Sequence, residues 1–305
     1  MTGRGKGTSE LPVNRTRFLG AVGLVVTVGL SIWVVRGVIV ILAASAILAP
    51  AATPAIPGVT TKTVTVTVGS RSFPARLSYP TRGGPYPTLA FGHGYTARAS
   101  WYASTLDALA RAGTVVIAPD SETGVAPSHS RFAGDLNRSL AWLASESRAG
   151  TVVPRGKVDG SRTAVAGHSM GGGAALLAAA RSRTVDTVAT LAAAETSPSA
   201  AAAVRRLQVP SLFVVGSDDR IFPAADTAMM FRRAPSPSLR ASITGGSHCG
   251  FQDKVPPACD ARGRISYPRQ RALTREQLRR WLERYLKGTP GTRVTGVQGI
   301  SYARR

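Results

Sequence analysis

The chain has 305 residues, and its 38 lysines and arginines outnumber its 16 aspartates and glutamates, which gives a formal net charge of +22. The basic residues occur singly or in pairs such as Arg205-Arg206, without interleaved aromatic residues, so they do not predict a nucleic-acid-binding surface. We interpret them as a solvated, arginine-rich surface with weak affinity for anionic envelope polymers. The length allows one domain of about 240 residues with an N-terminal extension.

The N-terminal region predicts export from the cell. Residues 1–17 form a basic segment, and residues 18–49 are apolar apart from Arg36. Basic residues before an apolar stretch hold the N-terminus inside and place the following chain outside. The stretch is either a membrane anchor or a long signal peptide, because Ala44-Ser45-Ala46 is a small-residue cleavage site. The sequence therefore predicts a protein that is secreted or anchored to the outer face of the membrane.

After a linker at residues 50–60, the pattern predicts one domain over residues 61–290 and a C-terminal tail at 291–305. Alternating Thr and Val at 63–68 and a second run at 73–79 predict an antiparallel strand pair. Short β-prone runs then alternate with helix-forming segments, which is typical of an α/β fold with a mostly parallel sheet flanked by helices. The predicted strands are 88–91, 114–118, 163–166, 185–191, 211–215 and 238–243, and the predicted helices are 100–112, 132–147, 170–181, 224–233 and 274–287.

The most informative motif is Gly167-His168-Ser169-Met170-Gly171, a G-x-S-x-G pentapeptide between a predicted strand and a predicted helix. A sharp strand-to-helix turn forces its central residue into a strained backbone conformation, and glycines on both sides leave room for that turn. The serine hydroxyl then lies above the sheet, at the positive end of a helix. Ser169 is therefore predicted to be a catalytic nucleophile.

A serine nucleophile needs a base and an orienting carboxylate, and in the α/β-hydrolase arrangement the order along the chain is Ser, acid, His. Of the four histidines, His248 alone follows Ser169 at the end of a predicted strand, so it is the predicted base. Asp218 and Asp219 follow the preceding strand. We favour Asp219, which is nearer to the turn at 221–223, and interpret Asp218 as a cap of that turn. Glu195 is a third carboxylate, which we interpret as a loop residue or an ion-pair partner.

Acyl transfer also needs two backbone N–H groups that stabilise the oxyanion. The amide of Met170, directly after the nucleophile, is the first candidate. The loop after the strand at 88–91 reads Gly92-His93-Gly94-Tyr95, and its glycines would let the backbone approach the substrate closely. Tyr95 would then supply the second amide. The alternative interpretation of Gly92-His93-Gly94 is a simple turn.

The two cysteines of the chain, Cys249 and Cys259, lie ten positions apart in a loop-like stretch rich in Gly and Pro. They predict a small disulfide, which fits an oxidising compartment. Two cysteines without a His/Asp cluster at metal-ligand spacing do not predict a zinc site. No metal ion and no organic cofactor are expected.

With these motifs in place, the chain resembles the cutinase-like polyester hydrolases, which are bacterial α/β-hydrolases related to dienelactone hydrolases. The resemblance spans roughly residues 59–286 and rests on the stretches 94–98, 130–131, 167–173, 219–223 and 246–248. It implies an α/β-hydrolase catalytic domain in which Ser169, Asp219 and His248 form the triad and Tyr95 and Met170 form the oxyanion pair. It also implies a monomer.

Two features of the chain depart from that family. Those hydrolases carry a tryptophan in the loop after the strand that follows the nucleophile helix, where it flanks an aromatic acyl group. Here the loop is Glu195-Thr196-Ser197-Pro198-Ser199, which has no aromatic residue. The cysteine pair after His248 also does not match the usual disulfide position near the C-terminus of those enzymes.

The predicted function is an exported serine ester hydrolase that forms an acyl-enzyme from a small or polymeric ester. No insertion resembles a lipase lid, so short to medium acyl chains are favoured. The predicted pocket is apolar and is lined by Tyr95, Trp101, Met170, Ile221 and Phe222. The same triad would also serve a serine peptidase, an amidase or an acyltransferase, and a non-catalytic binding module is a third interpretation.

Overall fold

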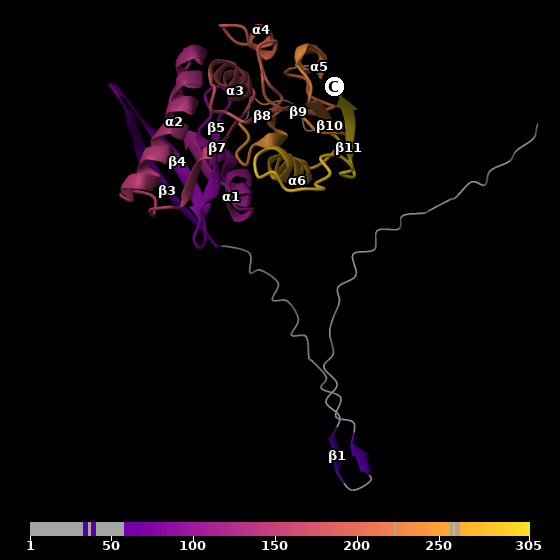
Figure 1. Cartoon of the computed structure of the whole chain (residues 1–305). Helices are drawn as coiled ribbons and strands as arrows, with labels where there is room; N and C mark the ends of the chain where they lie inside the picture. The colour runs from indigo at the N-terminus through magenta and orange to yellow at the C-terminus, as the bar shows by residue number, and fades with distance from the viewer. Residues whose placement is uncertain (1–32, 36–37, 41–57, 223, 257–258, 260–262) are drawn as a thin grey trace, which may run out of the picture. The chain divides into compact units, whose positions relative to one another are not determined.

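The computed structural model describes residues 33–35, 38–40, 58–222, 224–256, 259 and 263–305 (Figure 1). The chain divides into two compact units, Met1–Pro54 and Ala55–Arg305. In the first unit, strands β1 (Trp33–Val35) and β2 (Val38–Val40) pair antiparallel. The rest of the predicted signal or anchor at 18–49, the segment at 1–17 and most of the linker at 50–60 lie outside the described residues. No helix that the structure describes is long and apolar enough to cross a membrane.

The described residues of the second unit form a nine-stranded mixed sheet (Figure 1). Its strands are β3 (Val59–Val68), β4 (Arg71–Pro80), β5 (Tyr86–Gly92), β6 (Val115–Pro119), β7 (Val158–His168), β8 (Thr187–Leu191), β9 (Ser211–Gly216), β10 (Ser238–Ile243) and β11 (Ile300–Arg304). The order across the sheet is β11-β10-β9-β8-β7-β5-β6-β4-β3. From β10 to β6 each strand is parallel to its neighbour, whereas β4, β3 and β11 extend the two edges antiparallel. The predicted mostly parallel sheet is confirmed, and the predicted strand pair is the hairpin β3–β4.

The predicted C-terminal tail at 291–305 is corrected by the structure, because its last residues belong to the sheet. Strand β11 pairs antiparallel with β10 and places Ile300 opposite Ile243. Only Ile300 of this strand is buried, so its apolar alternation is too weak to mark a strand in the sequence. The domain therefore continues beyond residue 290.

Helices cover both faces of the sheet (Figure 1). They are η1 (Ala99–Tyr102), α1 (Ala103–Arg111), α2 (His129–Ala149), α3 (Met170–Arg181), α4 (Ala200–Val204), α5 (Ala224–Arg233), η2 (Cys249–Phe251) and α6 (Tyr267–Tyr285). The predicted bounds of α3 and α5 are confirmed. Helix α6 begins earlier than predicted, because Ser266 caps it by accepting a hydrogen bond from the Arg269 amide and a proline occupies its first turn.

Successive side chains of each strand point to opposite faces of the sheet, so the core has two layers. In β5, Ala90 belongs to a layer formed with α2, α3, α4 and α5, whereas Leu89 and Phe91 belong to a layer formed with α1 and α6. Strands buried on both faces read as continuous apolar runs, as Leu212 to Val215 do in β9. Because these strands are parallel, their carboxyl ends meet along one edge of the sheet, where ligand sites of open α/β sheets lie.

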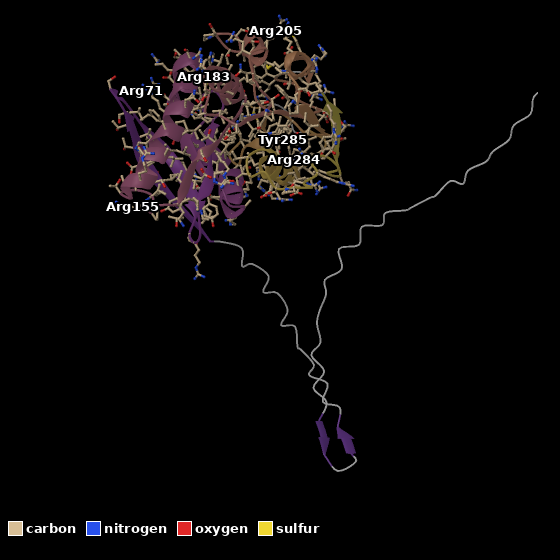
Figure 2. All side chains as sticks on the ribbon, in the orientation of Figure 1. Arg71, Arg155, Arg183, Arg205, Arg284 and Tyr285 are labelled. Carbon is tan, nitrogen blue, oxygen red and sulfur yellow. A yellow bond between two sulfur atoms is a disulfide. The ribbon has the colours of Figure 1, made fainter. Side chains whose placement is uncertain are left out.

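The arginines lie at separate places around the second unit (Figure 2). Arg71 belongs to β4 and Arg284 to α6, whereas Arg155, Arg183 and Arg205 lie in connections between elements. This distribution agrees with a solvated basic surface.

Candidate active site

Ser169 lies between β7, which ends at His168, and α3, which begins at Met170. Its backbone has φ 54° and ψ −119°, a left-handed conformation that costs a non-glycine residue about 1–3 kcal/mol. The turn is possible because neighbouring backbones approach very closely. A Cβ atom on Gly167 would lie 2.2 Å from the Gly171 carbonyl oxygen, and one on Gly171 would lie 2.2 Å from the Gly92 carbonyl oxygen.

Backbone hydrogen bonds hold Ser169 in this conformation. Its amide donates to the Leu191 carbonyl oxygen at 2.9 Å, and its own carbonyl oxygen accepts from the Ala194 amide at 3.0 Å. The Gly173 amide donates to the same carbonyl oxygen at 3.1 Å. The serine is therefore fixed between the end of β8 and the first turn of α3.

His248 and Asp219 form a buried pair on the loops that follow β10 and β9. The Nδ1 atom of His248 lies 2.8 Å from Oδ2 of Asp219, and their side chains are 5% and 1% exposed. The other carboxylate oxygen of Asp219 accepts from the amides of Ile221 and Phe222 at 3.0 and 2.9 Å. The aspartate is thus oriented by the turn that follows it.

Asp218, the other candidate aspartate, points elsewhere. Its carboxylate accepts two hydrogen bonds from the Arg264 guanidinium, at 2.8 and 3.0 Å. The Arg264 hydrogen bonds, with that of Ser217, hold the pKa of Asp218 well below its usual range. Of the two neighbouring aspartates, Asp219 contacts His248.

Ser169 and His248 line one pocket of about 490 Å³ at the carboxyl edge of the sheet. All five side chains that the sequence assigns to substrate binding line it as well: Tyr95, Trp101, Met170, Ile221 and Phe222. Asp219 is not part of the lining. The pocket therefore presents the serine and the imidazole to a ligand.

The loop after β5 carries Tyr95, which is expected to supply the second amide of the oxyanion pair. The Tyr95 hydroxyl donates to the Val125 carbonyl oxygen at 2.8 Å, while its side chain stays half exposed beside the pocket. His93 is buried below the loop, with its ring nitrogens 2.8 and 2.9 Å from the carbonyl oxygens of Gly94 and Ser121. Burial lowers the pKa of His93. Among the described residues, neither the Tyr95 amide nor the Met170 amide has an acceptor.

Sequence reasoning missed several residues of the pocket, and two of them accept hydrogen bonds from backbone amides. His129, at the start of α2, lines the pocket and accepts a hydrogen bond from the Ser197 amide at 3.1 Å through Nδ1. Glu195 also lines it, and its carboxylate accepts from the amides of Ala200 and Ala201 at the start of α4. Glu195 is thus a helix cap rather than the ion-pair partner that was one of its predicted roles. The remaining unpredicted lining residues are Gly94, Thr96, His168, Ala194, Cys249, Gln252, Pro256 and Cys259.

The predicted disulfide between Cys249 and Cys259 is confirmed. Cys249 directly follows His248, and both cysteines line the pocket. The covalent link therefore forms part of the wall next to the imidazole.

The residues that the structure describes contain no group of three or more His, Cys, Asp or Glu side chains that could hold a metal ion.

The fold and this geometry define a class of protein. The protein has a mixed sheet flanked by helices, which is consistent with the α/β-hydrolase fold. A strained serine and a His–Asp pair lie at the carboxyl edge of that sheet. The sequence matches the PET hydrolase-like family over residues 45–256, which is more than half of the chain. The chain belongs to the PET hydrolase-like family, and the predicted relationship to cutinase-like polyester hydrolases is confirmed.

Curated relatives include cutinases of Thermobifida. Cutinase est2 of Thermobifida alba is 31% identical over 175 residues, which cover 56% of each chain. Cutinase 1 of Thermobifida cellulosilytica is 31% identical over 183 residues, covering 59% of this chain and 66% of the relative. Chlorophyllase-1 of Arabidopsis thaliana is 30% identical over 99 residues, covering 32% of this chain and 30% of the relative. The chain thus spans about half the length of the first curated relatives that it matches.

Proposed function

We propose that this protein is a serine carboxylic ester hydrolase. The observation that carries the proposal is the strained Ser169, in a pocket that it shares with a histidine bonded to a buried aspartate. Membership of the PET hydrolase-like family and the names of the cutinase relatives support ester hydrolysis over amide hydrolysis or acyl transfer to another acceptor.

His248 removes the proton from the Ser169 hydroxyl, and the serine oxygen forms a bond to the ester carbonyl carbon. The tetrahedral intermediate collapses, the carbon–oxygen bond to the leaving alcohol breaks, and His248 gives its proton to that alcohol. His248 then removes a proton from water, whose oxygen bonds to the acyl carbon. The bond to the serine oxygen breaks and His248 returns the proton to that oxygen, which releases the carboxylic acid and the free serine. Asp219 keeps the imidazole in the required orientation and stabilises its protonated form.

The amides of Tyr95 and Met170 are proposed to stabilise the oxyanion. Met170 is the first residue of α3, where a backbone N–H has no partner within its own helix. The positive end of the helix dipole adds to this stabilisation. The lack of an acceptor for either amide among the described residues supports these roles.

Short to medium acyl esters are the proposed substrates. Ile221, Phe222, Met170 and Trp101 give the pocket an apolar surface that suits an aliphatic acyl group. The loop at 195–199 offers no aromatic ring to a large aromatic acyl group.

Export is proposed on the basis of the N-terminal segment and the disulfide. A basic stretch before an apolar one directs the following chain outward, and the Cys249–Cys259 bond suits an oxidising compartment. Cleavage or retention of residues 18–49 would be decided by mass measurement of the mature protein recovered from its host.

The test is hydrolysis of p-nitrophenyl acetate, butyrate and palmitate by the wild-type protein and by Ser169→Ala, with Ser145→Ala on α2 as the matched control. We expect faster turnover of the short esters, a loss of at least ~10³-fold in Ser169→Ala and wild-type rates in the control. Equal rates in Ser169→Ala and the wild type would reject the site. Faster turnover of a matched p-nitroanilide would favour the amidase alternative.

A further inference from the structure

A buried chain of hydrogen bonds joins three loops of the site through two side chains that are neither nucleophile nor base. The Gly94 amide lies 3.0 Å from the Tyr102 hydroxyl oxygen, which lies 2.8 Å from Nδ1 of His168. On the other side of the ring, Nε2 of His168 lies 3.0 Å from the His248 carbonyl oxygen. Tyr102 and His168 are fully buried.

The direction of every proton in this chain is determined by its two ends. A backbone amide can only donate, and a carbonyl oxygen can only accept. Nε2 of His168 must therefore carry the hydrogen that reaches the His248 carbonyl oxygen. A neutral imidazole then has a lone pair on Nδ1, which accepts the hydroxyl proton of Tyr102. The hydroxyl oxygen of Tyr102 in turn accepts the Gly94 amide proton.

Burial keeps both side chains in the protonation states that this arrangement needs. It lowers the pKa of His168 well below its ordinary value, and the nearby His248 lowers it further. Burial also raises the pKa of Tyr102, so that its hydroxyl keeps its proton. A proton on Nδ1 would remove the lone pair that accepts the Tyr102 hydroxyl proton, so this direction of the hydrogen bond requires a neutral His168.

The surroundings leave these groups little freedom to move. The Tyr102 ring packs on Phe91 at 5.0 Å between centroids, and the His168 ring packs on His248 at 4.7 Å. A Cβ atom at Gly94 would lie 3.1 Å from the Tyr102 hydroxyl oxygen and 3.2 Å from Nδ1 of His168. The absence of a side chain at position 94 lets the loop approach these two polar atoms.

We infer that Tyr102 and His168 are positioning residues. They hold the loop that carries Tyr95, the proposed oxyanion donor, at a fixed position relative to the loop that carries His248, the proposed base. Gly94 directly precedes Tyr95, and His168 directly precedes Ser169, so the hydrogen bonds restrain the backbone next to the proposed oxyanion donor, the nucleophile and the base. This inference rests on the proposed function. Neither side chain transfers a proton to the substrate; both act through the atoms that they hold in place.

The decisive variant is Tyr102→Phe, which removes one oxygen atom and keeps the ring. The Gly94 amide then loses its acceptor, and Nδ1 of His168 loses its nearer donor and keeps only the Gln252 side-chain nitrogen at 3.4 Å. We expect kcat for p-nitrophenyl butyrate to fall about 10- to 100-fold, because a displaced oxyanion donor costs part of the ~10²–10³-fold that its removal costs. KM should stay within about 3-fold, since the side chains that line the pocket are unchanged.

The matched control is Tyr302→Phe. The Tyr302 hydroxyl also accepts from a backbone amide, that of Val297 at 3.2 Å, and donates to a side chain, that of Gln277 at 2.8 Å. Tyr302 does not line the pocket. Both variants should lower the melting temperature, but kcat should fall in Tyr102→Phe alone.

His168→Gln and His168→Leu separate positioning from packing. A glutamine amide can still donate toward the His248 carbonyl oxygen, whereas leucine cannot, so His168→Gln should retain more kcat. Because the residues act as one unit, Tyr102→Phe combined with His168→Leu should lose no more than the larger single loss. If His168→Leu fails to fold, Tyr102→Phe and its control decide the question.

The inference is overturned if kcat of Tyr102→Phe stays within 2-fold of Tyr302→Phe, or if only KM changes. Wild type and Ser169→Ala are measured in the same assay, with labelling by a serine-reactive phosphonate. A wild type that neither hydrolyses the ester nor takes up the label rejects the proposed function itself. An active, labelled wild type with an unaffected Tyr102→Phe rejects the positioning role alone.

Discussion

Asp219 and His248 contact each other across 29 positions of sequence, with Nδ1 of the imidazole 2.8 Å from Oδ2 of the carboxylate. The two residues lie on neighbouring loops because β9 and β10 are adjacent and parallel, with Gly216 opposite Ile243 at their carboxyl ends. Asp218, one position away, is instead bonded to Arg264. Because these two adjacent aspartates have different partners, Asp218 can serve as the control for Asp219.

Asp219→Asn should lower kcat/KM by about 10³–10⁴-fold, because an amide does not hold the imidazole in the tautomer and orientation that a carboxylate does. Asp218→Asn is the control, and its effect on kcat/KM should stay within a few fold. Ester hydrolysis by the two purified variants checks this prediction. A larger loss of kcat/KM in Asp218→Asn than in Asp219→Asn would make Asp218 the carboxylate that orients the base.

Gly167→Ala should destabilise the protein by about 3 kcal/mol or prevent folding, since the added Cβ would lie 2.2 Å from the Gly171 carbonyl oxygen. Gly124→Ala is the control, because a Cβ there meets no atom within 4 Å. Urea unfolding of both variants measures the difference. Similar midpoints for the two would show that the turn accommodates a side chain at position 167.

Replacing both cysteines, as in Cys249→Ser with Cys259→Ser, should lower the free energy of unfolding by about 2–3 kcal/mol, because the bond closes a loop that the unfolded chain would otherwise leave open. Activity should fall too, since both residues line the pocket beside His248. Thermal melts and ester hydrolysis with and without a reducing agent provide the measurement. Reductant should change the wild type and leave the double variant unaffected.

Glu122 should make stability depend on pH. The hydrogen bond from Arg131, aided by the Ser128 amide and the charge of Arg71, lowers the pKa of Glu122 in the folded state. The unfolded chain therefore binds more protons between the two pKa values, and stability rises with pH in that window. The contribution is fully present above the ordinary carboxyl pKa of about 4.3 and is lost as pH falls through the lowered folded value.

Glu122→Gln tests this dependence. At pH 7 the variant should be less stable by about 1 kcal/mol, a modest amount because the Arg131 side chain is 62% exposed and well screened. The difference should shrink as the pH falls below about 4.3. Urea midpoints of both proteins across that range measure it, and a constant difference would contradict the assigned cause.

Much of the fold could be predicted from local patterns. Helix α3 occurs at its predicted bounds because its run of Ala and Leu has a high intrinsic helix propensity. Strands β5, β6, β8 and β9 are recognisable as apolar runs, since each is covered on both faces. Strand β11 was not, because it becomes a strand only through its pairing with β10.

The sequence by itself determined the strand-to-helix turn at Ser169, since glycines at 167 and 171 and the helix-forming run after them act within one short segment. Chain order also made His248 the one candidate base after the serine. The tertiary structure decided which aspartate contacts that base, where His129 and Glu195 lie, and how Tyr102 and His168 join the loops. These relationships depend on side-chain directions at loops brought together by strand order, and such directions leave no periodic signal in a sequence.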